Sequence, residues 1–173
     1  MKSFGFLKKT VEKDPMTPKY IKPDGTKVIE QPCELGLAVY ELSPDCTVIC
    51  RTYSHSNKLI LDWIRRRNLE IGRRYDEYGK IVYEYNSLYD EHNTLAKKYE
   101  TEYEYYDEGM KSKETTVLSP GDIKTEIKYD KSGKQIEKSE TRGTVKTWFD
   151  NTGKPIKREI DKGSGGKIIE DLN

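Results

Sequence analysis

The densest group of side chains able to do chemistry is a run of arginines: Arg65, Arg66, Arg67, Arg73 and Arg74. Guanidinium groups bind phosphate through paired hydrogen bonds, so this run could hold a nucleic acid. A run of acidic residues follows directly in the sequence. These residues could pair with the arginines within one chain or between neighbouring subunits. We therefore expect a solvated or protein-paired arginine surface, and nucleic-acid binding is the less favoured alternative.

Metal binding and nucleophilic catalysis have few candidate residues. Cys33, Cys46, Cys50 and His55 are four possible ligands, but the chain has no paired C-x-x-C motif. If Cys46 and Cys50 lay within one strand, they would be roughly 13 Å apart, beyond the reach of a shared zinc ion or a disulfide. A Cys50–His55 pair would still need an oxyanion site, and no glycine-rich loop precedes a helix. We expect no enzyme, no metal and no cofactor.

Tyrosines and glutamates alternate in the middle of the chain. Glu100, Glu102 and Glu104 would share the outer face of a strand and offer an acidic surface to a partner. The tyrosines could form an exposed ladder for sugars or nucleobases, but we favour cross-strand packing because the glutamates mark the solvent side. The tyrosines concerned are Tyr83, Tyr85, Tyr99, Tyr103, Tyr105 and Tyr106.

The elements that must position these residues follow from a phrase that recurs over residues 75–173: an aromatic residue, Asp, a few polar residues, then Gly or Asn. Asp accepts hydrogen bonds from backbone N–H groups just ahead of it, and Gly or Asn tolerates positive φ. Alternating residues flank each copy, as in half-buried strands. The phrase predicts an antiparallel meander of repeated hairpins. Its copies begin at Tyr75, Tyr89, Tyr106, Tyr129 and Phe149.

These copies resemble the YD repeat of RHS-type proteins, closely over residues 129–169 and loosely over 75–118. The family pattern is an aromatic–Asp pair, two residues, Gly and a basic residue, then a β run. The resemblance implies antiparallel β walls built without catalytic residues. The spacing of the earlier copies is irregular, as expected for repeats that have drifted.

The first part of the chain lacks this phrase. Residues 1–19 predict an arm in which Phe4 and Phe6 could contact a partner. Residues 20–74 predict a small α+β unit, with an inner hairpin over 35–53 and a helix over 58–71 that ends at Gly72. The expected fold class is therefore mainly β: a meander of repeat hairpins with a small N-terminal α+β unit that contains one helix.

Composition narrows the function further. Charged residues make up 35% of the chain and hydrophobic ones 34%, a lean core, and the net charge of +1 gives no bulk attraction to polyanions. Residues 1–74 hold 14 basic and 9 acidic residues, and residues 75–110 hold 3 and 10. A basic front and an acidic middle can attract copies of the same chain or a mixed-charge partner.

We expect a non-catalytic structural or interaction protein, a subunit of a larger assembly such as a virus or phage particle. It would contact its neighbours through sheet edges, the arm and charged patches. The alternatives are an immunity- or antitoxin-like protein that blocks a partner protein, and a nucleic-acid-binding accessory protein that uses the arginines. The three cysteines favour a reducing compartment, and the sequence predicts neither a secretion signal nor a membrane span, which places the protein in the cytoplasm or within a particle.

Overall fold

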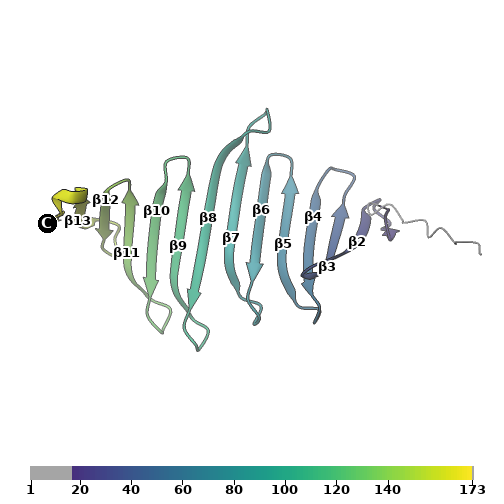
Figure 1. Ribbon diagram of the computed structural model, residues 1–173, viewed down its shortest axis with the longest axis horizontal. Coiled ribbons are helices and arrows are strands. Elements are labelled where there is room, and N and C mark those ends of the chain that lie inside the picture. The colour runs from purple at the N-terminus through teal and green to yellow at the C-terminus, as the bar shows by residue number, and fades with distance from the viewer. Residues whose placement is uncertain (1–16, 173) are drawn as a thin grey trace, which may run out of the picture.

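The computed structural model describes residues 17–172, which form one antiparallel sheet of fourteen strands. Each strand pairs with the strands before and after it in the sequence, so the sheet is a meander (Figure 1). A short 3₁₀ turn, η1 (Gly163–Gly165), precedes the last strand. The strands are β1 (Tyr20–Ile21), β2 (Lys27–Cys33), β3 (Gly36–Leu42), β4 (Val48–Ser54), β5 (Leu59–Arg66), β6 (Leu69–Tyr75), β7 (Ile81–Tyr89), β8 (Leu95–Tyr105), β9 (Lys111–Ser119), β10 (Ile123–Tyr129), β11 (Gln135–Arg142), β12 (Val145–Phe149), β13 (Pro155–Asp161) and β14 (Lys167–Asp171).

The recurring phrase forms the hairpin turns for the reason its residue types suggest. At Asp130, the backbone N–H groups of Ser132 and Lys134 donate to Asp130 Oδ1 at 2.9 and 3.0 Å. Gly133 then adopts a φ of +84°, and its N–H donates to the Asp130 carbonyl at 2.9 Å. Such a turn favours Asp in the first position and Gly or Asn in the fourth. Asp76, Asp90 and Asp150 make the same set of bonds.

The aromatic residue of the phrase has a separate structural role. The register of the strand pair shifts by a β-bulge immediately before it, as between Lys128 and Tyr129. The same shift precedes Tyr53 and Tyr105, so Tyr53-Ser54 is a further copy that carries Ser instead of Asp. In the copy between β8 and β9, Tyr105 is the residue after the register shift and the turn closes on Tyr106, whose carbonyl accepts from Gly109 at 2.8 Å. The sequence phrase at Tyr106-Asp107 was thus aligned one residue too late.

Antiparallel order places the turns alternately at two long margins of the sheet. The aromatic–turn copies at 53, 75, 105, 129 and 149 all fall at one margin, the lower one in Figure 1. The copy at Tyr89-Asp90 falls at the opposite margin. The copies are unevenly spaced because the strands between them differ in length, from five residues in β12 to eleven in β8.

Strand register defines two broad faces, because side chains alternate along each strand and paired residues share a face. Face A carries Arg51, Arg73, Thr101, Tyr103 and Ile160. Face B carries Cys50, Trp63, Tyr85, Glu126 and Ile169. Along face B one register row has no charged residue before Glu100 and mixes charged with uncharged residues from there on: Ile29, Tyr40, Cys50, Trp63, Gly72, Tyr85, Glu100, Val117, Lys124, Thr141, Lys146, Glu159, Ile169.

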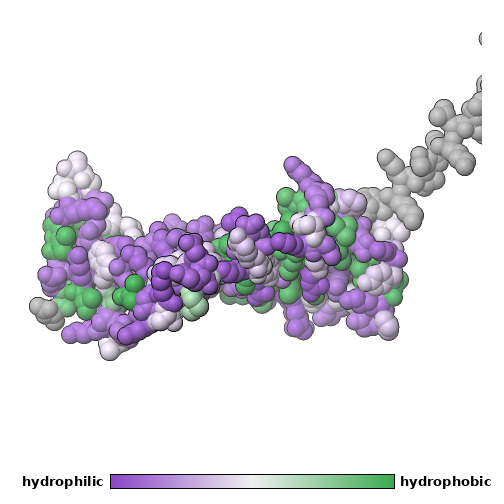
Figure 2. Space-filling view, turned by 90° about the horizontal axis from the view of Figure 1, so that it is seen from below, coloured by the Kyte–Doolittle hydropathy of each residue, from purple (hydrophilic) through white to green (hydrophobic). Residues whose placement is uncertain are grey.

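The core is small because the sheet is a single layer. Within residues 17–172 the buried hydrophobic residues are Val28, Ile29, Ala38 and Cys50, all in β2 to β4. This region includes the hairpin expected over 35–53, which is present as β3 and β4. Figure 2 shows the molecule from below as a thin slab, with hydrophilic side chains over its middle and hydrophobic ones nearer its two ends. The lean composition therefore reflects a sheet that no second layer covers in the described residues.

The helix expected over 58–71 is wrong, since this segment forms β5, a turn at Arg67-Asn68, and β6. Leu59, Trp63 and Ile64 have helical spacing, but hydrogen bonding to β4 and β7 decides the conformation. Arg67 turns the chain with a φ of +51°, without the glycine that usually marks a turn. The sheet continues from β6 into β7 across residue 74, where the α+β unit was expected to end. The described residues contain no helix long and apolar enough to cross a membrane.

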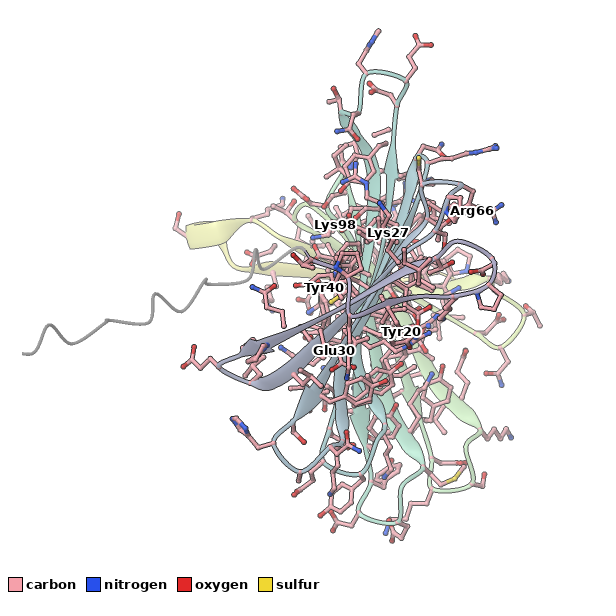
Figure 3. All side chains as sticks on the ribbon, turned by 90° about the vertical axis from the view of Figure 1, so that its right-hand side faces the viewer. Tyr20, Lys27, Glu30, Tyr40, Arg66 and Lys98 are labelled. Atoms are coloured by element: carbon pink, nitrogen blue, oxygen red, sulfur yellow. The ribbon has the colours of Figure 1, made fainter. Side chains whose placement is uncertain are left out.

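The sheet twists along its length. Figure 3 looks along it from the N-terminal end and shows the strands fanning around the long axis. Such a twist is expected for an antiparallel sheet that is free on both faces. It turns successive parts of each face in different directions, so residues far apart along the sheet do not form one flat surface.

Candidate interaction surfaces

An aromatic stripe follows the lower margin on face A, where the aromatic residue next to each register shift recurs at every second strand: Tyr53, Tyr75, Tyr105, Tyr129 and Phe149. Lysines lie against several of the rings. Lys80 Nζ is 5.2 Å from the Tyr105 ring centre, and Lys138 Nζ is 5.7 Å from that of Phe149. These lysine–ring contacts are cation–π interactions, which stabilise half-buried aromatic residues.

Hydroxyl groups fix part of this stripe. Tyr105 donates to the Ile81 carbonyl at 2.7 Å, and Tyr106 donates to the Tyr129 carbonyl at 2.8 Å. Burial raises the pKa of Tyr105 and of Tyr129, so both phenols are neutral at physiological pH. Rings held at their hydroxyls and covered by lysines are packing elements of a one-layer sheet. This favours the cross-strand interpretation over an open platform for stacked bases.

Face B carries a separate group of aromatic residues in β5 to β7, around Gly72. Gly72 lies between Trp63 and Tyr85 in the register row, and the Tyr85 ring covers it. A Cβ atom at Gly72 would lie 2.2 Å from Tyr85 Cε1. The Tyr85 hydroxyl donates to Glu70 Oε1 at 2.9 Å, which holds the ring in this position. Burial, together with this bond to Glu70, raises the pKa of Tyr85.

The six tyrosines considered as one ladder therefore divide between the two faces. Tyr83 and Tyr85 lie on face B with the glutamates of β8, whereas Tyr99, Tyr103 and Tyr105 lie on face A, and Tyr106 lies in a turn. The Tyr83 hydroxyl donates to Glu100. Burial and this bond raise the pKa of Tyr83 to about 12.

The acidic surface expected from β8 is present on face B. Glu100 is tied to Tyr83 and to Lys98, whose Nζ is 2.9 Å away. Glu104 approaches Lys113 at 3.2 Å, yet 64% of its side chain is exposed. Glu102, opposite Tyr83, is also exposed. Glu102 and Glu104 are thus the acidic groups of β8 most accessible to a partner.

The five arginines do not form one patch. Arg65 and Arg74 lie on face B, where Arg65 is 4.9 Å from the Tyr89 ring centre and Arg74 is 5.6 Å from that of Tyr83. Arg73 lies on face A and its Nε is 2.6 Å from Glu84 Oε2. Arg66 is also on face A, with 66% of its side chain exposed, and Figure 3 shows it pointing into solvent. Arg67 occupies the exposed β5–β6 turn.

The cysteines and histidines are dispersed in the same way. Cys50 is buried on face B, where burial raises the pKa of its thiol, while Cys33 and Cys46 are exposed. Cys46 lies in a turn with a φ of +65° rather than in a strand. His55 is in the next turn at the other margin, and no cluster of metal-ligating side chains occurs in the part of the chain that the structure describes. Phe4 and Phe6 lie outside the described residues.

The two ends of the sheet differ as edges. At the first, β1 covers only the start of β2, and Pro32 in β2 has no N–H to donate. At the last, β14 is exposed along all five residues, including Ile168 at 38% and Ile169 at 59%. Edge strands usually carry features that discourage pairing with another chain. The first edge carries such a feature. β14 has charged residues at both ends, but it presents two exposed isoleucines between them.

The fold agrees with the repeat pattern in the sequence, but comparison identifies no relative. No protein-family model matches the chain, and no curated protein matches it either. Its resemblance to YD repeats therefore depends on the aromatic–Asp–Gly copies alone, and the surfaces of the sheet are the features that bear on function.

Proposed function

We propose that this chain is a non-catalytic interaction protein, a subunit of a larger assembly that contacts neighbouring protein subunits through its sheet. The observation that carries the proposal is the single layer: no second layer covers either broad face within residues 17–172. A domain normally buries a sheet face against another layer around a common core. Association with neighbouring subunits would supply the cover that this chain lacks.

The proposal fits the distribution of charge and apolar residues. The most buried region is β2 to β4, whereas β14 presents isoleucines at an open edge. Ion pairs cover the middle of the sheet, as where Glu126 meets Lys113, Lys124 and Lys146 at 3.1–3.5 Å. Such a surface tolerates water, so the chain can persist alone until it meets its neighbours. A virus or phage particle is one assembly in which such a subunit would serve.

A second candidate function is supported by the acidic residues of β8. Glu102 and Glu104 are exposed on face B beside the tyrosines of β7. An immunity-like protein could use such a strip to cover a basic active site on a partner. The arginines give less support to the nucleic-acid alternative, because they are divided between faces and three of them face carboxylates at 4.0 Å or less.

The test is isolation of the tagged chain from its natural source under mild conditions, with chemical cross-linking before lysis. Light scattering and mass spectrometry then give the mass and composition of the complex. We expect a complex of several subunits that contains this chain at fixed stoichiometry. A stable complex with a single heterologous protein, lost in Glu102→Lys or Glu104→Lys variants, would favour the second candidate. A monomer before and after cross-linking would refute both.

A further inference from the structure

The outer side of β14 is the most open edge in the described chain. Within residues 17–172 no strand pairs with it, and all five of its residues, Lys-Ile-Ile-Glu-Asp, are exposed. Ile169 is 59% exposed although it lies in a strand. Unpaired backbone groups beside an exposed isoleucine form a template for another strand.

The backbone directions along β14 follow from one hydrogen bond. Leu172 N–H donates to the Ile156 carbonyl at 2.9 Å, so the amide of residue 172 points inward. Amides alternate in direction along a strand. The N–H and C=O groups of Lys167, Ile169 and Asp171 therefore point outward, toward the open edge.

We propose that β14 pairs with β14 of a second copy of this chain, antiparallel and centred on Ile169, so that two sheets join into one. This rests on the proposed function and names a partner for it. A two-fold axis at Ile169 brings outward-facing residues opposite one another, as an antiparallel ladder requires. Lys167 then lies opposite Asp171 of the second copy, and the same ion pair forms again on the other side of the axis.

The charge pattern selects this register. Moving the two-fold axis by one residue along the strand would place Lys167, or Asp171, opposite Ile169 of the second copy and remove both ion pairs. The side chains of Lys167, Ile169 and Asp171 all lie on face B, in the order basic, apolar, acidic. In the centred register this order is complementary to the same order running the opposite way in the second copy. Lys167 already approaches Glu159 of β13 at 2.7 Å, so it would lie between two carboxylates.

The opposite edge of the sheet is a poorer partner for β14. β1 covers the beginning of β2, and Pro32 removes a donor from the rest of that strand. Pairing of β14 with this edge would also be head-to-tail and would lead to open filaments rather than a closed dimer. The structure therefore favours two copies joined at β14.

The size of the contact sets its strength. One pair of five-residue strands buries less than the roughly 1,000 Å² expected of a stable interface, so the dimer should dissociate on dilution. Sedimentation velocity over a wide range of concentration of the full chain should show a reversible monomer–dimer equilibrium. In Ile169→Lys the dissociation constant should rise by about tenfold or more, because two ammonium groups meet at the axis.

Ile136→Lys is the matched control. Ile136 is also 59% exposed, but it lies in β11, an inner strand three places from β14 in the sheet, at the register shift opposite Lys128 and Tyr129. This variant should leave the dissociation constant within about twofold of the parent value, well below the change of about tenfold expected for Ile169→Lys. Equal weakening by both variants would show that added charge, and not the β14 edge, is responsible, and would overturn the proposal.

A charge exchange tests the register. Lys167→Asp and Asp171→Lys should each weaken self-association, because like charges then meet on both sides of the axis. A mixture of the two variants should form a heterodimer about as tight as the parent dimer, since every cross-pair is again of opposite sign. Absence of this rescue, or growth beyond dimers, would overturn the β14 pairing. If subunits still assemble in the source when Ile169→Lys is present, the edge inference fails and the proposed function stands.

Discussion

Replacing Gly72 with alanine should destabilise the sheet, because the added methyl group would enter space filled by the Tyr85 ring. The Cβ atom would lie 2.2, 2.6 and 2.8 Å from Cε1, Cζ and Oη of Tyr85. Contacts this short require the ring to move, and the movement would strain or break its hydrogen bond to Glu70. Glycine is therefore required here because an aromatic ring from the neighbouring strand packs directly against its backbone.

The expected magnitude combines two opposing effects. Overpacking costs about 1–3 kcal/mol, and disturbing the hydrogen bond from Tyr85 to a carboxylate costs about 1.5–3 kcal/mol when it is lost entirely. Against this, alanine restricts the unfolded chain and gains about 0.5–1 kcal/mol over glycine within a strand. We expect a net loss of about 1–3 kcal/mol in the free energy of unfolding, since partial movement of the ring spares part of the bond.

Urea unfolding followed by tryptophan fluorescence is the assay, because Trp63 is the register partner of Gly72. A double-mutant cycle with Tyr85→Ala isolates the contact: in that background Gly72→Ala should be neutral or stabilising by up to about 1 kcal/mol. Gly165→Ala is the control, because its added Cβ would meet nothing closer than 3.4 Å. If Gly72→Ala costs the same with and without the Tyr85 ring, the reasoning is refuted.

Three further predictions concern the turns and the charged face. Gly153→Val should lower stability by about 1–3 kcal/mol, because β-branched residues resist the φ of +86° there, whereas Gly165→Val should cost much less; equal thermal melts would contradict this. Asp130→Ala should lower the melting temperature more than Asp107→Ala, because Asp130 accepts two backbone N–H bonds and the turn at 106–110 closes on the residue before Asp107; the reverse order in calorimetry would count against the turn assignment. Burial opposes ionisation of Glu126, but lysine hydrogen bonds outweigh it and lower the pKa from 4.5 to about 2. Because the pKa is lower in the folded protein, ionised Glu126 stabilises the fold at pH values above its pKa in the unfolded chain. The free energy of unfolding should therefore fall by about 1–3 kcal/mol as the pH falls from about 4.5 to 2. Glu126→Gln should flatten this pH dependence in urea unfolding, and an unchanged slope would exclude the lysine cluster as its source.

Much of the architecture was predictable because the signals are local. An Asp followed by Gly or Asn specifies a turn from within five residues, and alternation specifies the strands on either side. The copies at Asp130 and Asp150 therefore gave the C-terminal hairpins directly. The copy at Tyr53 was missed because Ser54 stands where the phrase has Asp, although Asn57 fits the phrase and Ser54 Oγ accepts the Lys58 N–H at 3.1 Å.

The candidate surfaces were harder to predict, because face and margin depend on register. Arg65 and Arg66 are adjacent in sequence and lie on opposite faces, so a basic run became several separate groups. Glu100, Glu102 and Glu104 were placed correctly on one face, since they belong to a single strand. Phe4 and Phe6 lie outside the described residues, so their partner role stays a prediction.

The sequence by itself determined that the chain turns back repeatedly into antiparallel strands, because each turn is encoded in a few consecutive residues. Only the tertiary structure decided that residues 58–71 are two strands, that Gly72 seats Tyr85, and that β14 is left as an open edge. These outcomes depend on hydrogen bonds and contacts between neighbouring strands, whose register is fixed by bulges and strand lengths rather than by any one residue type.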